Sequence, residues 1–398
     1  MALAAAVIFL VVGILPWGSL GSAIDWNVLL MLAGTMLLLD SFIESKMPNL
    51  MADALLGISK NVMWLTVWLS VFSGVISAFI DNVATLLMVA PVALAVCKKL
   101  NISPVSMIIC IAVSSNLQGA ATLVGDTTSI MLAGYARMDF LDFFWMNGRP
   151  GIFFAVELGA LATIPIIMFL FRKEKEPVEP GELTKVTDYV PSAMMIAHIV
   201  LLIAASFIPE KPEITNGLIC VVCSLICIII EMIKAKSFAP ALGALKSVDY
   251  ETIVMLASLF VVIAGITNVG LIDIIANFIA GFGTKSIFLL YTIIVWGSVL
   301  VSAFIDNIPY VATMLPIVRG IASGLGLSPY FLYFGLLIGA TLGGNITPVG
   351  ASANITAVGM LKKEGYLVKF RDFVKIGLPF TLAATFVGYL FIWFVWAR

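Results

Sequence analysis

The hexapeptide Ser-Ala-Phe-Ile-Asp-Asn occurs twice in the sequence, at residues 77–82 and at residues 302–307, which are 225 positions apart. The same offset joins further residues downstream: Pro91 with Pro316, Thr122 with Thr347 and Gly125 with Gly350. At an offset of 224, Asp25 and Ala33 match Asp249 and Ala257. Chance does not readily produce such a series. The sequence therefore predicts a duplicated unit that spans most of the chain.

The composition indicates whether this chain folds in water or in a membrane. The chain has 398 residues, of which 61% are hydrophobic and 11% are charged. Average proteins carry about 25% charged residues, so a water-soluble globule of this composition would lack a polar surface. We therefore expect an integral membrane protein of the cell membrane, with the lipid bilayer as a partner. The net charge of -1 offers no basic patch, and nucleic acid is not an expected partner.

Segments of about 20 apolar residues can cross a bilayer as helices. We expect crossings near residues 2–20, 27–43, 105–135, 150–171, 192–208, 216–233, 251–267, 330–360 and 376–396. The segments 105–135 and 330–360 are too long for plain helices and have centres rich in Gly and Thr, which predicts broken helices. Residues 47–59 and 269–282 alternate apolar with polar residues, which predicts amphipathic helices at the membrane interface.

Two further apolar stretches, 64–97 and 286–322, have an Asp-Asn pair at the centre and are predicted to be re-entrant hairpins. Basic residues concentrate in cytoplasmic loops. With this assignment one side holds Lys46, Lys60, Lys98, Lys99, Arg172, Lys173, Lys175, Lys185, Lys234, Lys236, Lys246, Lys362, Lys363, Lys369, Arg371 and Lys375. The other side holds Arg137, Arg149, Lys211, Lys285, Arg319 and Arg398. We therefore expect a cytoplasmic N-terminus and an outside C-terminus.

These assignments define the predicted architecture. The fold class is an all-α polytopic membrane protein with two inverted-topology repeats, each containing a re-entrant helical hairpin and a broken transmembrane helix. The first repeat covers 1–171, a cytoplasmic linker and connecting helix cover 172–215, and the second, inverted repeat covers 216–398. The first hairpin enters from the cytoplasm and the second from outside. Inverted repeats of this kind are typical of secondary transporters that work by alternating access.

The two repeated Asp-Asn pairs are the predicted centre of an ion site. An ionisable residue at the middle of a membrane is costly unless it has a function or a partner. Helix ends at the hairpin tips and helix breaks expose carbonyl groups. Together with Asp81, Asn82, Asp306 and Asn307, and with Thr122 and Thr347, these carbonyls supply the hard oxygen ligands that suit sodium, or a carboxylate that takes up a proton.

Further site candidates lie in the centres of the broken helices, at Gly125, Asn345, Gly350 and Asn354. Asp126 follows Gly125 directly, and because its counterpart is Ala351 this third carboxylate breaks the symmetry. It either binds the transported species or caps the second half-helix, since Asp is a favoured N-cap residue. Asn354 matches Ser129 at the offset of 225, and both are expected to line the site.

Other reactive side chains are expected to have packing roles. Glu157 and the single histidine, His198, are ionisable, and we place each near a membrane interface. Cys220, Cys223 and Cys227 lie in one apolar run and are expected to be buried free thiols. A soft metal or metalloid site on that helix face is the alternative.

At these motifs the sequence resembles the ArsB/NhaD permease group of the ion transporter superfamily, which has a citrate-transporter-like domain and includes sodium/proton antiporters, arsenite permeases and the P protein. The resemblance covers nearly the whole chain and rests on residues 77–82, 121–126, 302–309, 343–345 and 350–354. It implies a homodimer with scaffold and transport domains, and an elevator-type movement of the hairpins and broken helices.

The sequence also departs from the pattern of that group. Relatives often read Gly-Gly-Thr-Ala-Thr and Gly-Asp-Pro-Pro-Asn, where this chain has Gln-Gly-Ala-Ala-Thr at 118–122 and Gly-Asp-Thr-Thr-Ser at 125–129. The first copy of the site is thus altered. Dicarboxylate carriers of the wider superfamily are expected to have Ser-Asn-Thr at the hairpin tips, and the Asp-Asn tips argue against simple sodium-dicarboxylate transport.

The function expected from these observations is ion-coupled secondary active transport, and in first place sodium/proton antiport. The alternative is a proton- or sodium-coupled permease for a small anion or arsenite. A distant alternative is an intramembrane aspartyl protease, since two membrane aspartates can share a proton. We do not expect an enzyme, because both aspartates lie at hairpin tips. No P-loop, Rossmann glycine pattern or His-rich motif is present, so we expect no cofactor beyond transported or coupling sodium and protons.

Overall fold

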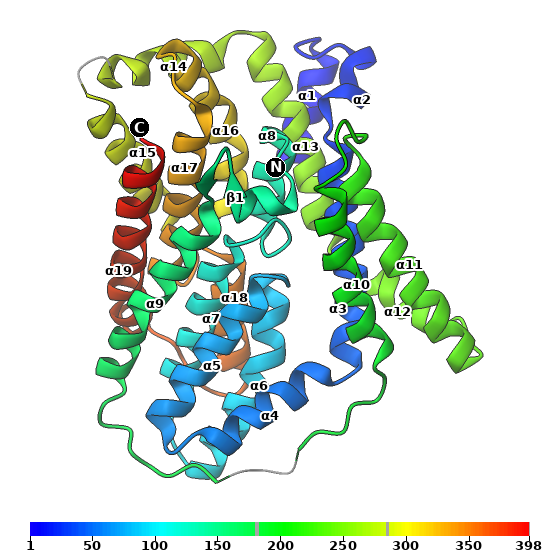
Figure 1. The fold of residues 1–398 in the computed structure, drawn as a ribbon, viewed down its shortest axis with the longest axis vertical. Coiled ribbons are helices and arrows are strands. Elements are labelled where there is room, and N and C mark those ends of the chain that lie inside the picture. Colours follow the sequence, from blue (N-terminus) through cyan, green and yellow to red (C-terminus); the bar gives the residue numbers. More distant parts are fainter. Residues whose placement is uncertain (180–182, 284–285, 398) are drawn as a thin grey trace.

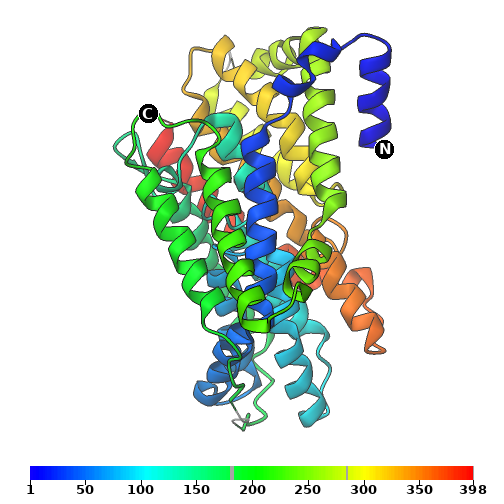
Figure 2. The same cartoon turned by 90° about the vertical axis from the view of Figure 1, so that its right-hand side faces the viewer.

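The computed structural model describes residues 1–179, 183–283 and 286–397. Some residues that the sequence assigns to loops and to the C-terminus lie outside the described residues, namely Pro180, Gly181, Glu182, Lys285 and Arg398. The chain forms a tall helical bundle (Figures 1 and 2). The first part comprises α1 (Ala2–Val11), η1 (Trp17–Ser19), α2 (Leu20–Ala23), α3 (Trp26–Glu44), α4 (Met47–Ile58), α5 (Val62–Ser77), α6 (Asn82–Leu100), α7 (Val105–Gly119), α8 (Thr127–Ala136), η2 (Phe140–Phe143), β1 (Trp145–Met146), β2 (Arg149–Pro150) and α9 (Ile152–Leu170). The second part comprises α10 (Val190–Ala205), α11 (Thr215–Ala235), α12 (Ala239–Ser247), α13 (Tyr250–Asn268), α14 (Leu271–Gly283), α15 (Ile287–Ser302), α16 (Asn307–Gly324), α17 (Pro329–Gly343), η3 (Gly344–Ile346), α18 (Ser352–Lys363) and α19 (Phe370–Trp396).

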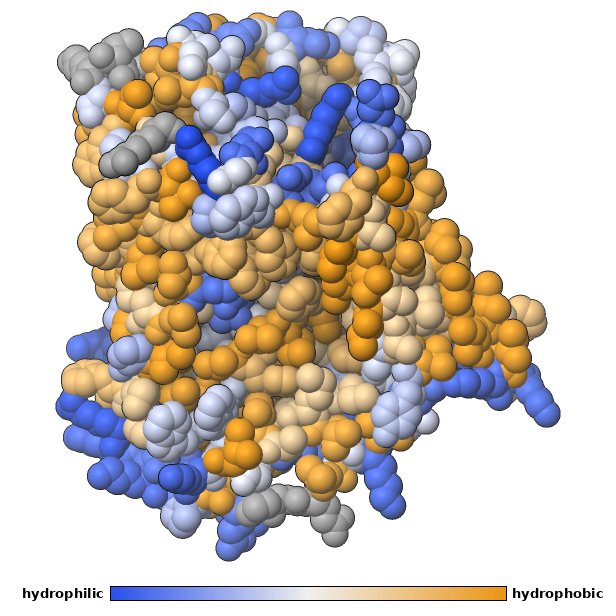
Figure 3. Space-filling view, viewed as in Figure 1, coloured by the Kyte–Doolittle hydropathy of each residue, from blue (hydrophilic) through white to orange (hydrophobic). Residues whose placement is uncertain are grey.

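Seven helices in the described part of the chain are long and apolar enough to cross a membrane: α3, α6, α9, α11, α13, α17 continued by η3, and α19. Figure 3 shows an apolar band across the middle of the face in view, with polar residues gathered above and below it. The protein is therefore a multi-pass membrane protein. A two-residue β ladder pairs Trp145 with Pro150 around a turn at Asn147 and Gly148, whose positive φ angles of 52° and 76° suit a tight hairpin turn. The all-α expectation did not include this ladder.

The expected first crossing at 2–20 is wrong. Helix α1 ends at Val11 after ten residues, Gly13 adopts a left-handed φ of 79°, and Pro16 precedes the short η1 and α2. A ten-residue helix is about 15 Å long, half of what a bilayer core requires. Helix α1 packs against α13 at the end of the molecule where α2 lies (Figure 2). The placement of the N-terminus on the basic side depended on that crossing and loses its basis.

The segments expected to form hairpins and broken helices each form a pair of helices, and α6 by itself is long enough to cross a membrane, which the expectation of a re-entrant hairpin did not include. Helices α5 and α6 meet at residues 78–81, and α15 and α16 meet at residues 303–306. Helix α7 is followed by α8, and α17 by η3 and α18, with irregular backbone in between. Residues 107–119 of α7 and 331–343 of α17 are buried without interruption, so these two helices form the centre of the core. The expected interfacial segments form α4 and α14, whereas α12 was not predicted.

The two hairpins have their open ends on opposite faces of the molecule. In the first hairpin, the Val62 amide donates to the Glu176 carbonyl and Lys99 pairs with Glu179, at 3.0 Å each, so both ends contact the 172–190 linker. In the second hairpin, the Arg319 guanidinium lies 5.9 Å from the ring centre of Tyr135, near the end of α8. Figure 1 places α4, α5 and α6 toward one end of the bundle and α14, α15 and α16 toward the other.

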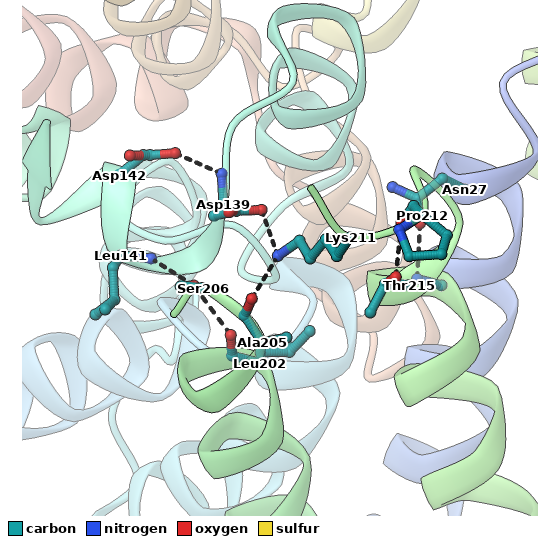
Figure 4. A network of polar contacts seen from close by, with 11 residues as sticks. Asn27, Asp139, Leu141, Asp142, Leu202, Ala205, Ser206, Lys211, Pro212 and Thr215 are labelled. Atoms are coloured by element: carbon teal, nitrogen blue, oxygen red, sulfur yellow. Dashed lines mark hydrogen bonds and ion pairs between the residues drawn. The ribbon is translucent and has the colours of Figure 1, made fainter. Parts of the chain in front are cut away.

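A polar network at the end opposite the linker fixes α10 against the segment that follows α8 (Figure 4). Lys211 pairs with Asp139 at 2.6 Å and donates to the Ala205 carbonyl at 3.0 Å. The Ser206 hydroxyl accepts from the Leu141 amide at 3.4 Å. Because the Lys211 side chain is only 12% exposed, this ion pair is better shielded than an ordinary surface pair. The network sets the position of α10 relative to the first broken helix.

Candidate ion-binding site

Both repeated aspartates lie at hairpin tips as N-cap residues. Asp81 Oδ1 accepts from the amides of Val83 and Ala84 at 3.0 and 3.1 Å, at the start of α6. Asp306 Oδ1 accepts from the Ile308 amide at 2.9 Å, at the start of α16, and its Oδ2 accepts from the Ser352 hydroxyl at 3.2 Å. Each cap uses mainly one carboxylate oxygen. A second oxygen therefore remains for another ligand, and more freely so at Asp81.

A cavity of about 290 Å³, here called the larger cavity, lies between the two tips and the helices α3 and α13. From the tips and breaks it is lined by Asp81, Asn82, Asp126, Thr127, Asn307 and Ser352, and from α3, α12 and α13 by Asp40, Ser247, Asp249 and Thr252. Four of these side chains are carboxylates, and none of the described lining residues is Lys, Arg or His. Such a lining has a negative potential and concentrates cations.

Asp126 occupies the N-cap position of α8 without capping it. Its carboxylate makes no capping hydrogen bond to the helix, and Oδ2 instead accepts from the Thr128 hydroxyl at 2.6 Å. The Thr128 hydroxyl lies 3.0 Å from that of Thr341 on α17, which links the two broken helices. Asp126 also lines the larger cavity. Of the two readings left open by the sequence, this geometry favours a role in the site over helix capping.

Three asparagine side chains join the first hairpin tip to both broken helices. Asn82 Nδ2 donates to Asn116 Oδ1, and Asn116 Nδ2 donates to Asn345 Oδ1, each at 2.9 Å. Asn116 Nδ2 also lies 2.8 Å from the Thr341 carbonyl, and Asn345 Nδ2 donates to the Val113 carbonyl at 3.0 Å. Asn345 does not line the larger cavity. Its amide holds the two repeats together at their centre.

The predicted threonine and glycine ligands hold the tips in place. The Thr122 hydroxyl donates to the Ala78 carbonyl and the Thr347 hydroxyl to the Ala303 carbonyl, so each broken helix is tied to its own hairpin. A Cβ on Gly125 would lie 2.7 Å from the carbonyl oxygens of both Ser77 and Ala78. A Cβ on Gly350 would lie 2.8 Å from that of Ser302. Only glycine permits this approach at either position.

The second tip has a different environment from the first. Asn307 is 3% exposed and lines the larger cavity, and its Nδ2 has no hydrogen-bond partner in the described residues. Asn354 Nδ2 donates to the carbonyls of Gly344 and Thr347, both at 2.9 Å, as Ser129 donates to Gly119 at 3.3 Å in the first copy. Asn354 and Ser129 thus brace the helix breaks, and neither lines the larger cavity.

The sequence reasoning missed three residues of this site. Asp40 lies in the second half of the apolar helix α3, and Asp249 was noted only as a repeat match. An ionisable residue within a span is itself a signal of function, and for Asp40 it was overlooked. Asn116 has Thr341 as its counterpart at the offset of 225, so no repeated motif draws attention to it.

The other reactive residues divide between packing and the site. Cys220, Cys223 and Cys227 are buried and free, as expected, and none lines the larger cavity. Glu157 also lies outside that cavity. His198 is not near an interface as expected: it lies in the middle of α10, 1% exposed, against Cys220. Within the described residues no three His, Cys, Asp or Glu side chains converge on one metal position, so any sodium site here must include amide, hydroxyl or carbonyl oxygens.

Comparison with known proteins assigns the chain to a family. The family model described as citrate transporter matches residues 1–339. An uncharacterized transporter of Mycobacterium tuberculosis is 28% identical over 391 residues, which cover 94% of this chain and 86% of that protein. The P protein of Homo sapiens is 26% identical over 442 residues, covering 92% of this chain and 53% of that protein.

The structure of the YdaH transporter of Alcanivorax borkumensis has the same fold, with a TM-score of 0.66 and 14% identity over 95% of this chain and 86% of that chain. The Mycobacterium tuberculosis relative and the YdaH structure are both described as transporters, and the family is one of membrane transporters, not of enzymes. The chain is accordingly a secondary transporter and belongs to the citrate transporter family, within the ion transporter superfamily.

Proposed function

We propose that this transporter is a sodium/proton antiporter. The observation that carries the proposal is the larger cavity, whose described lining contains Asp40, Asp81, Asp126 and Asp249 and no basic side chain. A small anion alone would be repelled from such a lining, whereas a monovalent cation or a proton is attracted. Membership of a transporter family indicates the class of activity. The negative lining of the larger cavity supports a cation, rather than an anion, as the transported species.

In this mechanism a proton and a sodium ion compete for the same carboxylates. The free oxygen of Asp81, with Asn82, Asn307 and nearby carbonyl oxygens, coordinates sodium in one half-cycle. Asp306 does not itself line the larger cavity and supplies a second carboxylate from the adjacent tip, next to Asn307. In the other half-cycle the carboxylates carry protons. Bound sodium and bound protons each reduce the negative charge of the site, so either loaded state crosses the membrane region at a lower electrostatic cost than the empty charged site.

The movement that we propose is an elevator-type displacement of the hairpins and broken helices in a homodimer, as the family resemblance implies. The supporting geometry is the hydrogen bonding of both tips to the broken helices through Thr122, Thr347 and Asn116. These contacts make hairpins and broken helices one rigid body. The residues of α3 and α13 that face this body line the opposite wall of the larger cavity.

The test is a pH-dye assay in reconstituted proteoliposomes, with sodium, lithium and potassium added separately. Wild type, Asp81→Asn and Asp306→Asn are compared, and Glu157→Gln serves as a control because Glu157 lies outside the larger cavity. We expect sodium-dependent proton movement in wild type and in the control, and its loss in both aspartate variants. Vesicles that take up no cation and release no proton would refute antiport.

A second candidate is uptake of citrate as a complex with a divalent cation. The family description names citrate, and the unpartnered Asn307 amide offers a donor to a carboxylate ligand. A volume of about 290 Å³ lies near the lower limit of about 300 Å³ for small-molecule sites. Free citrate would be repelled, so its uptake should require the metal. Labelled citrate uptake with and without Mg²⁺ in the same vesicles separates this candidate from antiport. Arsenite has less support, because no cysteine lines the larger cavity.

A further inference from the structure

The carboxylate of Asp126 is held by a hydroxyl group rather than by the backbone of the helix that follows it. At the two hairpin tips, Asp81 and Asp306 accept from backbone amides at the start of the next helix, as N-cap residues usually do. Asp126 precedes α8 in the same way but makes no capping hydrogen bond, and its Oδ2 accepts from the Thr128 hydroxyl at 2.6 Å. A side chain therefore sets the direction of this carboxylate.

The hydrogen-bonding capacity of the two threonine hydroxyls gives the direction of the contacts. A threonine hydroxyl has a single proton to donate, and an ionised carboxylate can only accept. Thr128 uses its proton on Asp126, so Thr341 is the donor in the 3.0 Å contact between the two hydroxyls. This contact is the one hydrogen bond of the Thr341 hydroxyl among the described residues. Thr341 thus holds Thr128, and Thr128 holds Asp126.

The two threonines lie behind the larger cavity. Thr128 and Thr341 are both 0% exposed, so water does not compete for their hydroxyls, and hydrogen bonds in such a buried environment are strengthened. Neither threonine lines the larger cavity, whereas Asp126 does. The hydroxyls therefore do not touch a cation in that cavity and act on it through the position of Asp126.

The residues of this hydrogen-bonded series depart from the internal repeat together. At the offset of 225, Asp126, Thr128 and Thr341 correspond to Ala351, Ala353 and Asn116. The two alanines offer neither a carboxylate nor a hydroxyl, so the second copy has no equivalent series. The contact also joins the two copies, because α8 belongs to the first and α17 to the second. The additional carboxylate thus occurs together with the two hydroxyls that orient it.

We propose that Thr341 is a positioning residue of the ion site, which through Thr128 directs the Asp126 carboxylate into the larger cavity. The inference rests on the proposed function, since it concerns a carboxylate that binds the transported cation. Without the Thr341 hydroxyl, the Thr128 side chain is no longer fixed, and the carboxylate turns toward the amides at the start of α8, where aspartate is a favoured cap. Sodium then binds more weakly, while the maximum rate is retained.

The experiment measures the half-saturating sodium concentration in wild type, Thr341→Val, Thr341→Ser and Thr128→Val. The two readouts are sodium-dependent proton movement in proteoliposomes and the sodium-dependent rise of the melting temperature in detergent. Valine removes the hydroxyl and leaves the Thr341 carbonyl to accept from Asn116. We expect Thr341→Val to raise the half-saturating concentration roughly threefold to tenfold, as for the loss of one hydrogen bond, with the maximum rate unchanged. Thr341→Ser keeps the hydroxyl and should restore the wild-type value.

The double variant Thr128→Val/Thr341→Val tests whether Thr341 acts through Thr128. Its half-saturating concentration should equal that of Thr128→Val alone, because the Thr341 hydroxyl then has no acceptor to hold. Thr385→Val is the matched control. Thr385 is 0% exposed on α19 and its hydroxyl has no partner in the described part of the chain, so its loss should leave the sodium dependence unchanged.

Additive effects of the Thr128 and Thr341 substitutions would overturn the inference. A lower melting temperature of Thr341→Val with a wild-type half-saturating sodium concentration would also overturn it, since the hydroxyl would then serve packing only. A wild type whose melting temperature responds to sodium but that moves no protons would refute antiport alone, and the melting curves of the variants would then decide the inference. A wild type without a sodium response in either readout would refute both.

Discussion

At the scale of single residues, charge placement decides what the larger cavity can hold. Asp81 and Asp126 come from the hairpin tip and the helix break, and Asp40 reaches the same cavity from α3. We expect these carboxylates to have different roles. Asp81 and Asp126 lie on the hairpin and the broken helix that move together, and they coordinate the ion. Asp40 lies on α3, outside that moving part, and adds to the negative potential that attracts the ion. This distinction can be tested with substitutions that remove one charge.

Asp40→Asn should weaken the apparent affinity for sodium without abolishing transport. For a charge about 8 Å from the ion, effective dielectric constants between 20 and 80 give a change of about 0.5–2 kcal/mol, or roughly twofold to thirtyfold in the half-saturating sodium concentration. The measurement is the sodium dependence of proton movement. Glu157→Gln removes a membrane carboxyl that does not line the larger cavity and should leave this dependence unchanged. An unaltered Asp40→Asn curve would remove Asp40 from the site.

Asn116→Ala should destabilise the whole protein. It leaves the amide groups of Asn82 and Asn345 buried without their shared partner, and unsatisfied buried groups cost about 1–3 kcal/mol each. We expect a clear fall in the melting temperature in detergent. Ser114→Ala, on the same buried helix, lies outside this network and should lower it much less. Equal melting temperatures for the two variants would contradict the central role of Asn116.

At the scale of elements, the close approach of hairpin and broken helix is the decisive contact. The two parts of each repeat meet where Gly125 and Gly350 leave room for the hairpin carbonyls. Because this approach occurs at both tips, a change in one copy should disturb the site as a whole.

Gly125→Ala should abolish transport and reduce stability, because its Cβ would lie 2.6–2.7 Å from three carbonyl oxygens and would force the tip away. Gly359→Ala is the matched control: it lies in α18 with open space around its Cβ and should be neutral or stabilise by up to about 1 kcal/mol. Transport assays and thermal unfolding of both variants check this. A fully active Gly125→Ala would show that the tip tolerates displacement.

These elements could be predicted from the sequence because each motif occurs twice, and two occurrences in similar apolar stretches are stronger evidence than one. Two copies of a motif within apolar stretches gave the helix pairs α5–α6 and α15–α16 and both breaks to within a few residues. The end of α1 was not predicted, because the helix stops while the apolar sequence continues. Hydropathy carries no information on the positive φ of Gly13, which breaks the helix there. The links from Asn116 to Asn82 and Asn345 span 34 and 229 residues, and no local pattern reveals such distant contacts.

At the scale of the whole molecule, the larger cavity runs toward the face of the 172–190 linker. Its lining follows α3 from Met36 and Asp40 to Ile43, and the next residue, Glu44, accepts a hydrogen bond through its carbonyl from Thr187 of the linker. The linker face carries the Lys- and Arg-rich segments that mark cytoplasmic loops. We propose that the larger cavity opens on the linker face and that this face is cytoplasmic.

Ile43→Cys should therefore react with a membrane-impermeant thiol reagent from the cytoplasmic side, and saturating sodium should slow the reaction. The five native cysteines are buried and give a low background. Trp17→Cys is the matched control, because Trp17 is 64% exposed and lies in η1, which joins α1 to α2 at the opposite end of the molecule. We expect inside-out vesicles to label Ile43→Cys and right-side-out vesicles to label Trp17→Cys. The reverse pattern would show that the linker face is outside, so that the observed state is open to the exterior and the charge bias was misread.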